Sequence, residues 1–472
     1  CICSDKTGTL TENRMTVEEV VLRFPGRPLA SAQVSADAGG KMLLSCMLAC
    51  NTVRERGGKL AGDATECALV SYARACRFAG GYKRLGVIPF SSERKMMTVA
   101  AATREGKFCF SKGGTEVLLE KCSRIYDGAV RPMTPADRAA ISAKTRELAS
   151  RALRVLAFAY RPFTGEVLEE ELVFLGLCGM IDPPRAGARE AVEECAQAGI
   201  RTVMITGDHR ETAFAIASRL GIAASEREVL TGAQLDALAE RELDARIRST
   251  RVFARVTPRH KSLIVERLQA AGEVVAMTGD GINDAPGIRR ADIGIAMGIA
   301  GTDVTKNAAD MVIADDNFST IVTAVREGRH IFSNIKKTIL FFLATNLAEV
   351  LSILIVTLAL YRFDFLTSTQ LLWINLITDS LPVLSLGAEV ADADCMRRPP
   401  VRAADLFSAE SLASVAVYGL MQTALCVGAF VCSLRLWGNE AAVTVAFFVL
   451  SFLELFHSFN IRSARGSAFG RG

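Results

Sequence analysis

The sequence predicts a doubly wound α/β domain, an α+β domain inserted into it, and an all-α transmembrane bundle. Three observations predict this architecture. Short apolar segments that end in Gly, Asp or Thr alternate with helical patterns, as in a parallel sheet covered by helices. Residues 20–172 interrupt this alternation with strands and helices of their own. Beyond residue 330 the chain consists mainly of long apolar runs.

The parallel sheet is predicted from four pairs of a strand and a following helix. The strands are expected at 172–182, 200–206, 251–256 and 273–278, and the helices at 185–198, 210–220, 259–271 and 283–290. This pattern divides the chain into a split domain, an inserted domain and a membrane region. Their expected limits are 1–19 with 173–330, then 20–172, then 331–472.

Polar residues collect at the predicted carboxyl ends of these strands, where doubly wound sheets place their active sites. The three clusters are Asp5-Lys-Thr-Gly-Thr9, Thr206-Gly-Asp208 and Thr278-Gly-Asp-Gly-Ile-Asn-Asp284. The sequence contains no glycine-rich P-loop with its Gly-Lys-Ser/Thr ending, so phosphate binding by that motif is excluded. What remains is a set of carboxylates with one lysine.

This set of residues is sufficient for phosphoryl transfer, which consists mainly of positioning and charge neutralisation. Asp5 can accept a phosphoryl group as a nucleophile. Asp280 and Asp284 can hold Mg²⁺, which prefers one or two carboxylates together with phosphate oxygens. Lys261 can balance the charge of the phosphate. Any one of these aspartates alone would be better explained as a turn residue or helix cap, so the grouping carries the prediction.

Four segments of the membrane region are long and apolar enough to cross a bilayer, which takes about 20 residues. They are expected at 338–361, 371–390, 411–435 and 441–460. Basic residues gather before the first, between the second and third, and after the fourth: Lys336, Lys337, Arg397, Arg398, Arg402, Arg462 and Arg465. The positive-inside rule then places both chain ends and the 391–408 loop in the cytoplasm. We expect a multi-pass protein of the cell membrane, in contact with the lipid bilayer, with cytoplasmic catalytic domains.

Three acids lie inside the predicted spans, where a charge is costly and by default marks an ion path. One such acid alone could be protonated and bonded to a neighbour. Three acids with amide and hydroxyl groups at helical spacing are better explained as a site of hard oxygen ligands, which suits Ca²⁺. The expected ligands are Asn346, Glu349, Asn375, Thr378, Asp379 and Glu454.

Composition argues against several other kinds of site. The net charge of +4 on 472 residues gives no indication of nucleic-acid binding. The 4 histidines stand far apart, so a histidine metal cluster is not expected. The 13 cysteines show no paired spacing, which indicates reduced thiols rather than a disulfide framework. No feature indicates an obligate protein partner.

Taken together, the motifs resemble those of the P-type ATPases, a branch of the haloacid-dehalogenase-like fold. The matching segments are Asp5-Lys-Thr-Gly-Thr-Leu-Thr11, Asp182-Pro-Pro-Arg185, Met204-Ile-Thr-Gly-Asp208 and Thr278-Gly-Asp-Gly-Ile-Asn-Asp-Ala-Pro286. Within that family the chain is similar to calcium pumps of the sarco/endoplasmic-reticulum type, in a bacterial-looking version. The polar residues of the spans stand where that subgroup keeps calcium ligands, and Glu349 with Glu454 favours it over the plasma-membrane calcium pumps.

The resemblance also implies roles for individual residues. Asp5 resembles the aspartate that is phosphorylated, and Thr7, through its carbonyl, and Asp280 resemble its Mg²⁺ ligands. The residues that resemble phosphate-side contacts are Thr206, Gly207, Asp208, Arg255, Lys261 and Asn283.

In the inserted domain, the resemblance implies an ATP site. Its residues are Glu66, Phe90, Lys112 and Arg154, with Phe90 stacking on adenine. Without the neighbouring motif, Phe90 would be taken for a core aromatic. Ser92 stands where animal calcium pumps carry an arginine, and Arg94 is expected to replace it. The family's Lys-Gly-Ala-Pro-Glu appears as Lys112-Gly-Gly-Thr-Glu116, which changes the turn after the lysine.

The chain is expected to be a truncated piece of a pump. The family's actuator domain and first four spans should precede Cys1, and its last two spans should follow Gly472. The whole protein would then use ATP and Mg²⁺ to move Ca²⁺ out of the cytosol, while the piece alone would not transport. Alternatives are a pump for Mn²⁺, Na⁺ or H⁺, a membrane-anchored phosphatase of the same superfamily, and a non-enzymatic membrane protein. Thr7 argues against the phosphatase, because such enzymes usually place an acid–base aspartate there.

Overall fold

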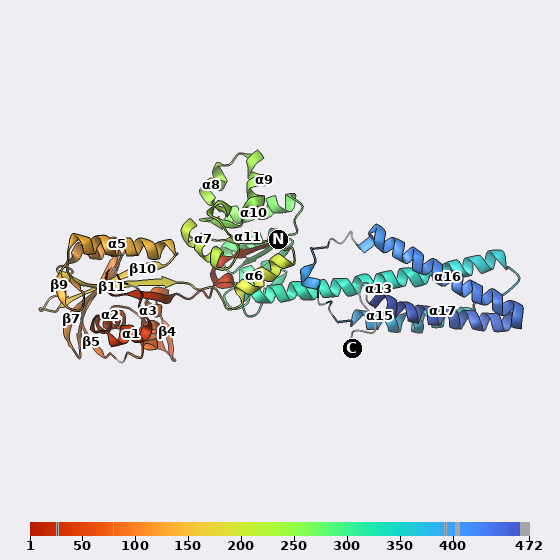
Figure 1. Ribbon diagram of the computed structural model, residues 1–472, viewed down its shortest axis with the longest axis horizontal. Helices are drawn as coiled ribbons and strands as arrows, with labels where there is room; N and C mark the ends of the chain where they lie inside the picture. The colour runs from red at the N-terminus through yellow and green to blue at the C-terminus, as the bar shows by residue number, and fades with distance from the viewer. Residues whose placement is uncertain are drawn as a thin grey trace. The chain divides into compact units, whose positions relative to one another are not determined.

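The computed structural model describes residues 1–462 except 25, 27, 79, 391, 393 and 402–405 (Figure 1). The chain divides into two compact units, one of residues 1–193 and 201–320, the other of residues 194–200 and 321–472. The first unit contains the two large β-sheets and the second contains the long helices. Each unit is described separately.

The first sheet of the first unit is wholly parallel, with strand order β13-β14-β12-β1-β15-β16-β17. Its strands are β1 (Ile2–Asp5), β12 (Thr202–Ile205), β13 (Val229–Thr231), β14 (Val252–Ala254), β15 (Ala276–Gly279), β16 (Ile293–Met297) and β17 (Met311–Ile313). Its helices are α6 (Ala188–Gln197), α7 (Arg210–Arg219), α8 (Gly232–Ala237), α9 (Glu240–Ser249), α10 (Pro258–Ala270), α11 (Ala285–Arg290) and α12 (Asp303–Ala308). β1 lies in the centre, so Asp5 ends a buried strand between β12 and β15. The predicted doubly wound domain is confirmed.

The second sheet has the strand order β5-β6-β7-β10-β11-β8-β9, with β2 paired to β11. Its strands are β2 (Thr16–Val21), β5 (Tyr82–Ser91), β6 (Met96–Thr103), β7 (Gly106–Gly113), β8 (Cys122–Tyr126), β9 (Val130–Pro132), β10 (Arg154–Pro162) and β11 (Leu172–Ile181). Its helices are α1 (Ser31–Ala36), α2 (Ala38–Ala49), α3 (Ala64–Ala75), α4 (Thr115–Lys121) and α5 (Pro135–Ser150), and β3 (Arg54–Arg56) pairs with β4 (Lys59–Ala61). Figure 1 shows α2 and α5 on opposite faces of this sheet, against β10 and β11.

One predicted strand lies in the other sheet. Residues 172–182 were expected in the parallel sheet, but β11 pairs antiparallel with β10 and β2 and parallel with β8. Every residue of β11 is buried. A fully apolar strand carries no alternation that shows which sheet it joins, so its position after the inserted segment was misleading. The proposed domain limits themselves stay a prediction.

The second unit is helical. Its elements are α13 (Phe318–Ala359), α14 (Ser368–Trp373), a π-helical turn (Ile374–Thr378), α15 (Ser380–Gly387), α16 (Ala409–Trp437) and α17 (Asn439–Arg462). Among the described residues, α13, α16 and α17 are long and apolar enough to cross a membrane. The second expected span, 371–390, is broken into α14, the π-helical turn and α15, and so does not form one long helix.

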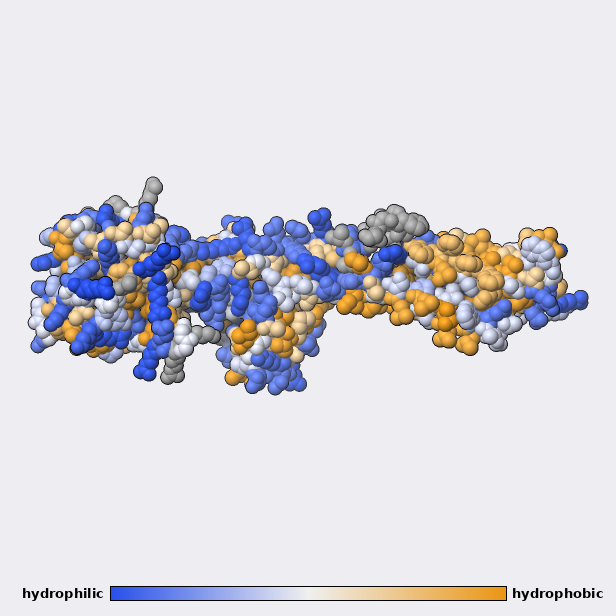
Figure 2. All heavy atoms as spheres, turned by 90° about the horizontal axis from the view of Figure 1, so that it is seen from below, coloured by the Kyte–Doolittle hydropathy of each residue, from blue (hydrophilic) through white to orange (hydrophobic). Residues whose placement is uncertain are grey.

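Large apolar side chains remain exposed along these helices, which Figure 2 shows as orange spheres over this unit. Examples are Val350 and Leu358 on α13, Leu420 and Leu425 on α16, and Phe452 on α17. Apolar patches of this extent mark contact with a membrane or another protein. Together with the span-length helices, they identify this unit as the membrane part of the chain.

Candidate active site and cation site

Asp5, at the carboxyl end of β1, meets residues from α10, β15 and the turn after β15. The amine Nζ of Lys261 contacts Asp5 Oδ2 and lies 2.5 Å from Asp284 Oδ1. The backbone N–H of Asp5 donates to Thr278 Oγ1 at 3.0 Å. The carboxylate of Asp5 also accepts a hydrogen bond from the backbone of Thr7. The parallel sheet therefore brings together residues that are more than two hundred positions apart in the sequence, as predicted from the strand ends.

Gly8 allows the loop after Asp5 to turn back over the strand ends. Its φ of +77° lies in the left-handed region, and a Cβ on this residue would stand 3.2 Å from Asp280 Oδ2. Arg185 holds the same loop by donating to the carbonyl oxygens of Gly8 at 2.8 Å and Thr11 at 3.1 Å. The loop thus places Asp280 beside Asp5 with little free space for any other side chain.

The charges at this site do not balance. Burial raises the pKa of Asp5, and the Lys261 ammonium only partly opposes that rise. Burial also raises the pKa of Asp280, and the nearby Asp5 and Asp284 carboxylates raise it further. For Lys261, burial lowers the pKa, but both carboxylates raise it, and the net shift is upward. Lys261 engages Asp284, while Asp5 and Asp280 place two interacting carboxylates at the strand ends, the number that Mg²⁺ prefers together with phosphate oxygens.

The predicted phosphate-side residues lie at the neighbouring strand ends. Thr206 is buried, and its Oγ1 accepts from the Asp208 backbone N–H at 3.1 Å. Arg255 follows β14 with a φ of 51°, donates its backbone N–H to the Asp208 carbonyl, and keeps its guanidinium 3.0 Å from His209 Nε2. Gly207 and Asn283 are exposed in loops at the same sheet edge. These positions are compatible with phosphate contacts, whose assignment stays a prediction.

Sequence reasoning missed two residues that support the loop after β1, Lys6 and Asp182. Lys6 pairs with Asp208 at 2.7 Å, which links the first two strand ends. Asp182 accepts from Thr11 Oγ1 at 2.5 Å and from the backbone N–H of Arg14 at 3.1 Å. The quoted motif Asp182-Pro-Pro-Arg185 contained this signal, but the sequence did not show which segment its side chains contact.

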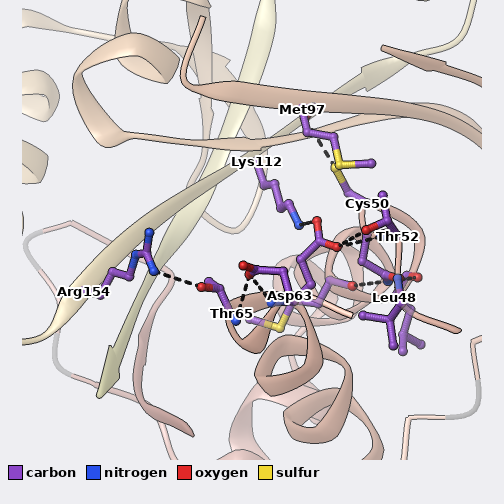
Figure 3. A network of polar contacts seen from close by, with 12 residues as sticks. Leu48, Cys50, Thr52, Asp63, Thr65, Met97, Lys112 and Arg154 are labelled. Atoms are coloured by element: carbon purple, nitrogen blue, oxygen red, sulfur yellow. Dashed lines mark hydrogen bonds and ion pairs between the residues drawn. The ribbon is translucent and has the colours of Figure 1, made fainter. Parts of the chain in front are cut away.

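Glu66 is the centre of a polar network in the second sheet domain, and Figure 3 labels its partners Thr52 and Lys112. Its Oε1 accepts from Lys112 Nζ at 2.6 Å, and its Oε2 accepts from both the backbone N–H and Oγ1 of Thr52 at 2.7 Å. Arg154 donates to Thr65 Oγ1 at 3.1 Å, next to Glu66 in α3. Burial raises the pKa of Glu66, but the hydrogen bonds from Lys112 and Thr52 outweigh it, so the net shift is downward. Three of the predicted ATP-site residues are thus within one network.

Phe90 is 58% exposed at the end of β5, so it is not a core aromatic. Ser91, the residue after Phe90, pairs with Met96 of β6, and the next residue of β6, Met97, pairs with Lys112 of β7. An exposed ring at this edge is available for stacking. Arg94 forms a pair with Glu169 through two hydrogen bonds of 2.7 Å, so its guanidinium is already engaged.

Lys95, which was not predicted, lies in the same hairpin. It is exposed, and its backbone carbonyl accepts from the Gly114 N–H at 3.1 Å, beside the loop that follows Lys112. Its φ of 52° holds the turn between β5 and β6. The turn thus adds an exposed cation to the hairpin that carries Phe90, which makes Lys95 a further candidate for contact with nucleotide phosphates.

In the second unit, the three membrane acids are buried close to one another. Glu349 is 8%, Asp379 2% and Glu454 1% exposed. The amide nitrogen of Asn375 donates to both oxygens of Glu349, at 3.1 and 3.4 Å. The charge of Glu454 interacts with those of Asp379 and Glu349. These acids therefore share one region of the bundle, with Thr378 buried beside Asp379.

Two findings limit this candidate cation site. Asn346 is exposed and donates its amide to the Phe342 carbonyl at 2.8 Å, and no hydrogen bond among the described residues joins it to the three acids. In the part of the chain that the structure describes, no three His, Cys, Asp or Glu side chains are grouped closely enough to hold a metal ion. Thr345, which hydrogen-bonds to Asp379, was not predicted. The calcium ligand set stays a prediction.

Three segments of the chain match known protein families. Residues 40–187 match the P-type ATPase cytoplasmic domain N, residues 261–325 match the haloacid dehalogenase-like hydrolases, and residues 363–472 match the C-terminus of cation transporting ATPases.

Curated relatives match the chain over its whole length. Calcium-transporting ATPase 1 of Bacillus cereus is 42% identical over 100% of this chain and 56% of its own length. The calcium-transporting ATPase of Bacillus subtilis is 40% identical over 98% of this chain and 56% of its own. Calcium-transporting ATPase type 2C member 1 of Bos taurus is 37% identical over 100% of this chain and 52% of its own. The chain spans about half the length of these relatives.

Proposed function

Because the chain belongs to the P-type ATPases, we propose that the whole protein couples ATP hydrolysis, through a phosphorylated Asp5, to export of Ca²⁺ from the cytosol. Relatives at about 40% identity are named calcium-transporting ATPases, which supports this choice of cation. Since the chain spans about half of those relatives, the proposal concerns the whole pump. The contact of Lys261 with Asp5 and Asp284 carries the proposal.

The phosphoryl step follows from that contact. An Asp5 carboxylate oxygen forms a bond to the γ-phosphorus of ATP, the bond from that phosphorus to the β–γ bridging oxygen breaks, and ADP leaves with the electron pair. The Lys261 ammonium faces Asp5 and can stabilise charge on the transferring group. Thr278, which accepts from the Asp5 backbone, fixes the end of β1 during the step.

The negative site around Asp5 fits Mg²⁺, which Asp5, the Thr7 carbonyl and Asp280 would hold. When bound, Mg²⁺ supplies neutralisation of the phosphate charge. A Cβ at Gly8 would stand 3.2 Å from Asp280 Oδ2, so the glycine leaves room for that carboxylate. The surplus of carboxylates over cations at this site is the observation that supports a metal there.

ATP would bind between Phe90 and the Glu66 network. The exposed Phe90 ring offers a stacking surface for adenine, and Lys112 and Arg154 supply positive charge. Both oxygens of Glu66 already accept hydrogen bonds, so we propose that Glu66 orients Lys112 and does not itself take an adenine contact.

Ca²⁺ would occupy the region shared by Glu349, Asp379 and Glu454. The charge interactions among these acids would be relieved by a divalent cation, and Asn375 and Thr378 supply neutral oxygens. We place the protein in the cell membrane with both sheets on the cytoplasmic side. The loops that carry most of the Lys and Arg residues lie on the same side of the spans as the sheets, and such loops usually face the cytoplasm.

The proposal is tested by phosphorylating the whole pump in membranes with radiolabelled ATP. Wild type should form an acid-stable, hydroxylamine-labile phosphoenzyme when Ca²⁺ is present, and Asp5→Asn should form none. Asp364→Asn, which removes an exposed carboxylate between α13 and α14, is the matched control and should label as wild type. Undiminished labelling of the Asp5→Asn protein would remove the proposed nucleophile.

A further inference from the structure

Glu389 joins three helices at one end of the bundle, through its carboxylate and its backbone carbonyl. It follows the end of α15 and is 6% exposed. Its Oε2 accepts from Nε of Arg462, the last residue of α17, at 2.6 Å. Its backbone carbonyl accepts from Nδ2 of Asn334 in α13 at 3.0 Å, and the same amide donates to the Gly387 carbonyl at 3.3 Å. We call Asn334, Glu389 and Arg462 the clamp.

Each helix held by the clamp also carries one of the membrane acids. α13 carries Glu349, the segment before α15 carries Asp379, and α17 carries Glu454. Among the described residues, α13, α15 and α17 thus meet twice, once at the acids and once at the clamp. A contact at one end of a rigid helix fixes the height of residues further along it, because a helix rises by a constant amount per residue.

Each acid lies at a fixed distance from the clamp along its helix. Asn334 precedes Glu349 by about 22 Å along α13. Asn375, which contacts Glu349, precedes Glu389 across the π-helical turn and the whole of α15. Asp379 precedes Glu389 by about 15 Å, and Glu454 precedes Arg462 by about 12 Å. The clamp contacts are therefore in register with the acid contacts, and a slip at the clamp would move the acids apart along the bundle axis.

The contacts of the clamp also satisfy groups that would be costly to leave unpaired. A buried carboxylate is costly without a partner, so Glu389 depends on the Arg462 guanidinium. Arg462 lies in the last turn of α17, where a cation interacts favourably with the helix dipole. Asn334 satisfies two carbonyl groups that the end of α15 leaves without helical partners. Loss of the Glu389–Arg462 pair therefore frees α17 from the segment after α15, which Asn334 and His330 still join to α13.

We propose that the clamp is a positioning device that sets the axial register of α13, α15 and α17, and thereby the affinity of the pump for its transported cation. This inference rests on the proposed function, because it assigns a role relative to the cation site. A simple helix-end cap would contribute to stability alone. Loss of a positioning device also changes the cation concentration needed for activity. Exchanging the two charged residues restores the ion pair and should therefore restore that concentration.

The test uses the whole pump in membranes, with ATPase activity measured as the free Ca²⁺ concentration is varied. Arg462→Gln and Glu389→Gln should each raise the half-activating Ca²⁺ concentration by about threefold to tenfold. Arg462→Lys keeps the charge and should lie closer to wild type. The charge swap, Glu389→Arg with Arg462→Glu, should return the value to within about twofold of wild type. The control is Arg435→Gln, which removes an exposed arginine in the last turn of α16 and should have no effect.

Phosphorylation from inorganic phosphate without Ca²⁺ separates positioning from misfolding, because it requires a folded active site and an empty cation site. It should survive in every clamp variant. Single variants with wild-type Ca²⁺ dependence, or a charge swap that restores nothing, would overturn the clamp. The same membranes are titrated with Mn²⁺, Na⁺ and protons. If Mn²⁺, Na⁺ or protons activate the ATPase and Ca²⁺ does not, the choice of Ca²⁺ is wrong, and the clamp variants are compared with that cation instead. If no cation activates the wild-type ATPase, both the proposed function and the clamp are overturned.

Discussion

At the scale of single residues, the active site is defined by a shortage of positive charge. Lys261 faces Asp5 and Asp284, while Asp280 lies beside them across the Gly8 loop. Burial raises the pKa of Asp5 and of Asp280, because ionised carboxylates are disfavoured there without a cation. The arrangement is suited to phosphoryl transfer with a metal, and without a metal the carboxylates repel one another.

The raised pKa of Asp5 predicts a pH-dependent stability. A carboxyl group whose pKa is raised by folding stabilises the folded state below its unfolded pKa, and that contribution is lost as pH rises through the folded pKa. Asp5→Asn cannot ionise, so in Mg²⁺-free buffer it should melt higher than wild type at about pH 8 and nearly with it at about pH 4. Each pKa unit corresponds to about 1.4 kcal/mol, and each kcal/mol to roughly 2–4 °C for a domain of this size.

Calorimetry of the chain in detergent micelles measures this difference. Addition of Mg²⁺ should narrow the gap, because the cation offsets the repulsion among the carboxylates of the wild type. An Asn variant that melts below wild type at the higher pH would show that the carboxylate stabilises the folded state, contrary to the direction of its pKa shift.

Phe90→Ala should weaken ATP binding to the chain. Stacking of a base on an aromatic ring contributes about 1–3 kcal/mol, which corresponds to roughly 5- to 150-fold in the dissociation constant. Because Phe90 is exposed, its removal leaves no cavity and the melting temperature should stay close to that of wild type. Titration calorimetry with ATP measures the change. Tyr82→Ala removes another exposed aromatic from β5 and should bind ATP as wild type does; equal losses in both variants would mean that Phe90 has no special role.

At the scale of elements, the helix between α14 and α15 is broken where the cation ligands are expected. The N–H of Asp379 donates to the Ile374 carbonyl at 3.0 Å, a bond that spans one residue more than in an α-helix. Pro382, in the first turn of α15, has no N–H for the Thr378 carbonyl. Such π-helical turns frequently occur at functional sites. At the break Thr378 and Asp379 are buried while Asn375 is exposed, and the Thr378 carbonyl has no N–H of residue 382 to accept from.

Replacing this proline should straighten the helix at the expense of cation affinity. In Pro382→Ala, the new N–H can bond to the Thr378 carbonyl, which removes that oxygen from the site and favours a regular turn. The half-activating Ca²⁺ concentration of the pump should rise by about threefold or more. Val383→Ala alters the next side chain while keeping the proline, and should behave as wild type. A Pro382→Ala pump with unchanged Ca²⁺ dependence would show that the break does not contribute to the site.

The same scale shows how far sequence reasoning reached. The strands β12, β14 and β15 and the helices that follow them were predicted because each pair has its own pattern, whereas β13, β16 and β17 of the same sheet were not predicted. β11 was predicted as a strand but placed in the wrong sheet, because a strand buried on both faces shows no alternation. The break in the second span was signalled by Pro382, although the turn itself lies at Ile374–Thr378, before the proline.

Contacts of the candidate sites were predictable only where a motif placed both partners. Asp5, Lys261 and Asp280 come together because strands of one sheet end at the same edge. The pairing of Arg94 with Glu169, and that of Glu389 with Arg462, joins residues far apart in the sequence with no motif to connect them. Sequence therefore identified Arg94 as a cation near the ATP site but could not show that a carboxylate already holds it.

At the scale of the whole molecule, the candidate active site and the candidate cation site lie in different units. Asp5 belongs to the first unit, and the membrane acids belong to the second. α13 begins at Phe318, within the first unit, and continues through the second to Ala359, so one helix is common to both. In the proposed pump, cation binding must favour phosphorylation by ATP. By thermodynamic linkage, the state phosphorylated from ATP must then bind the cation differently from the unphosphorylated state.

Asp379→Asn tests this coupling in the whole pump. Asp379 is 2% exposed, its Oδ1 has no hydrogen-bond partner among the described residues, and its charge interacts with that of Glu454. A cation that bridges the acids would satisfy that oxygen, so the amide should lower cation affinity by two orders of magnitude or more, about 3 kcal/mol. At Ca²⁺ concentrations that saturate wild type, phosphorylation from ATP should therefore be lost.

Phosphorylation from inorganic phosphate should survive in Asp379→Asn. That reverse reaction requires the cation site to be empty, and the substitution leaves the first unit unchanged. Both reactions are measured with radiolabelled phosphate on the same membranes, with Asp364→Asn as the exposed carboxylate control. Loss of both reactions would indicate misfolding and would leave no support for coupling. Retention of both at wild-type Ca²⁺ concentrations would exclude Asp379 from the cation site, and the three acids would then be a structural cluster that shares protons within the bundle.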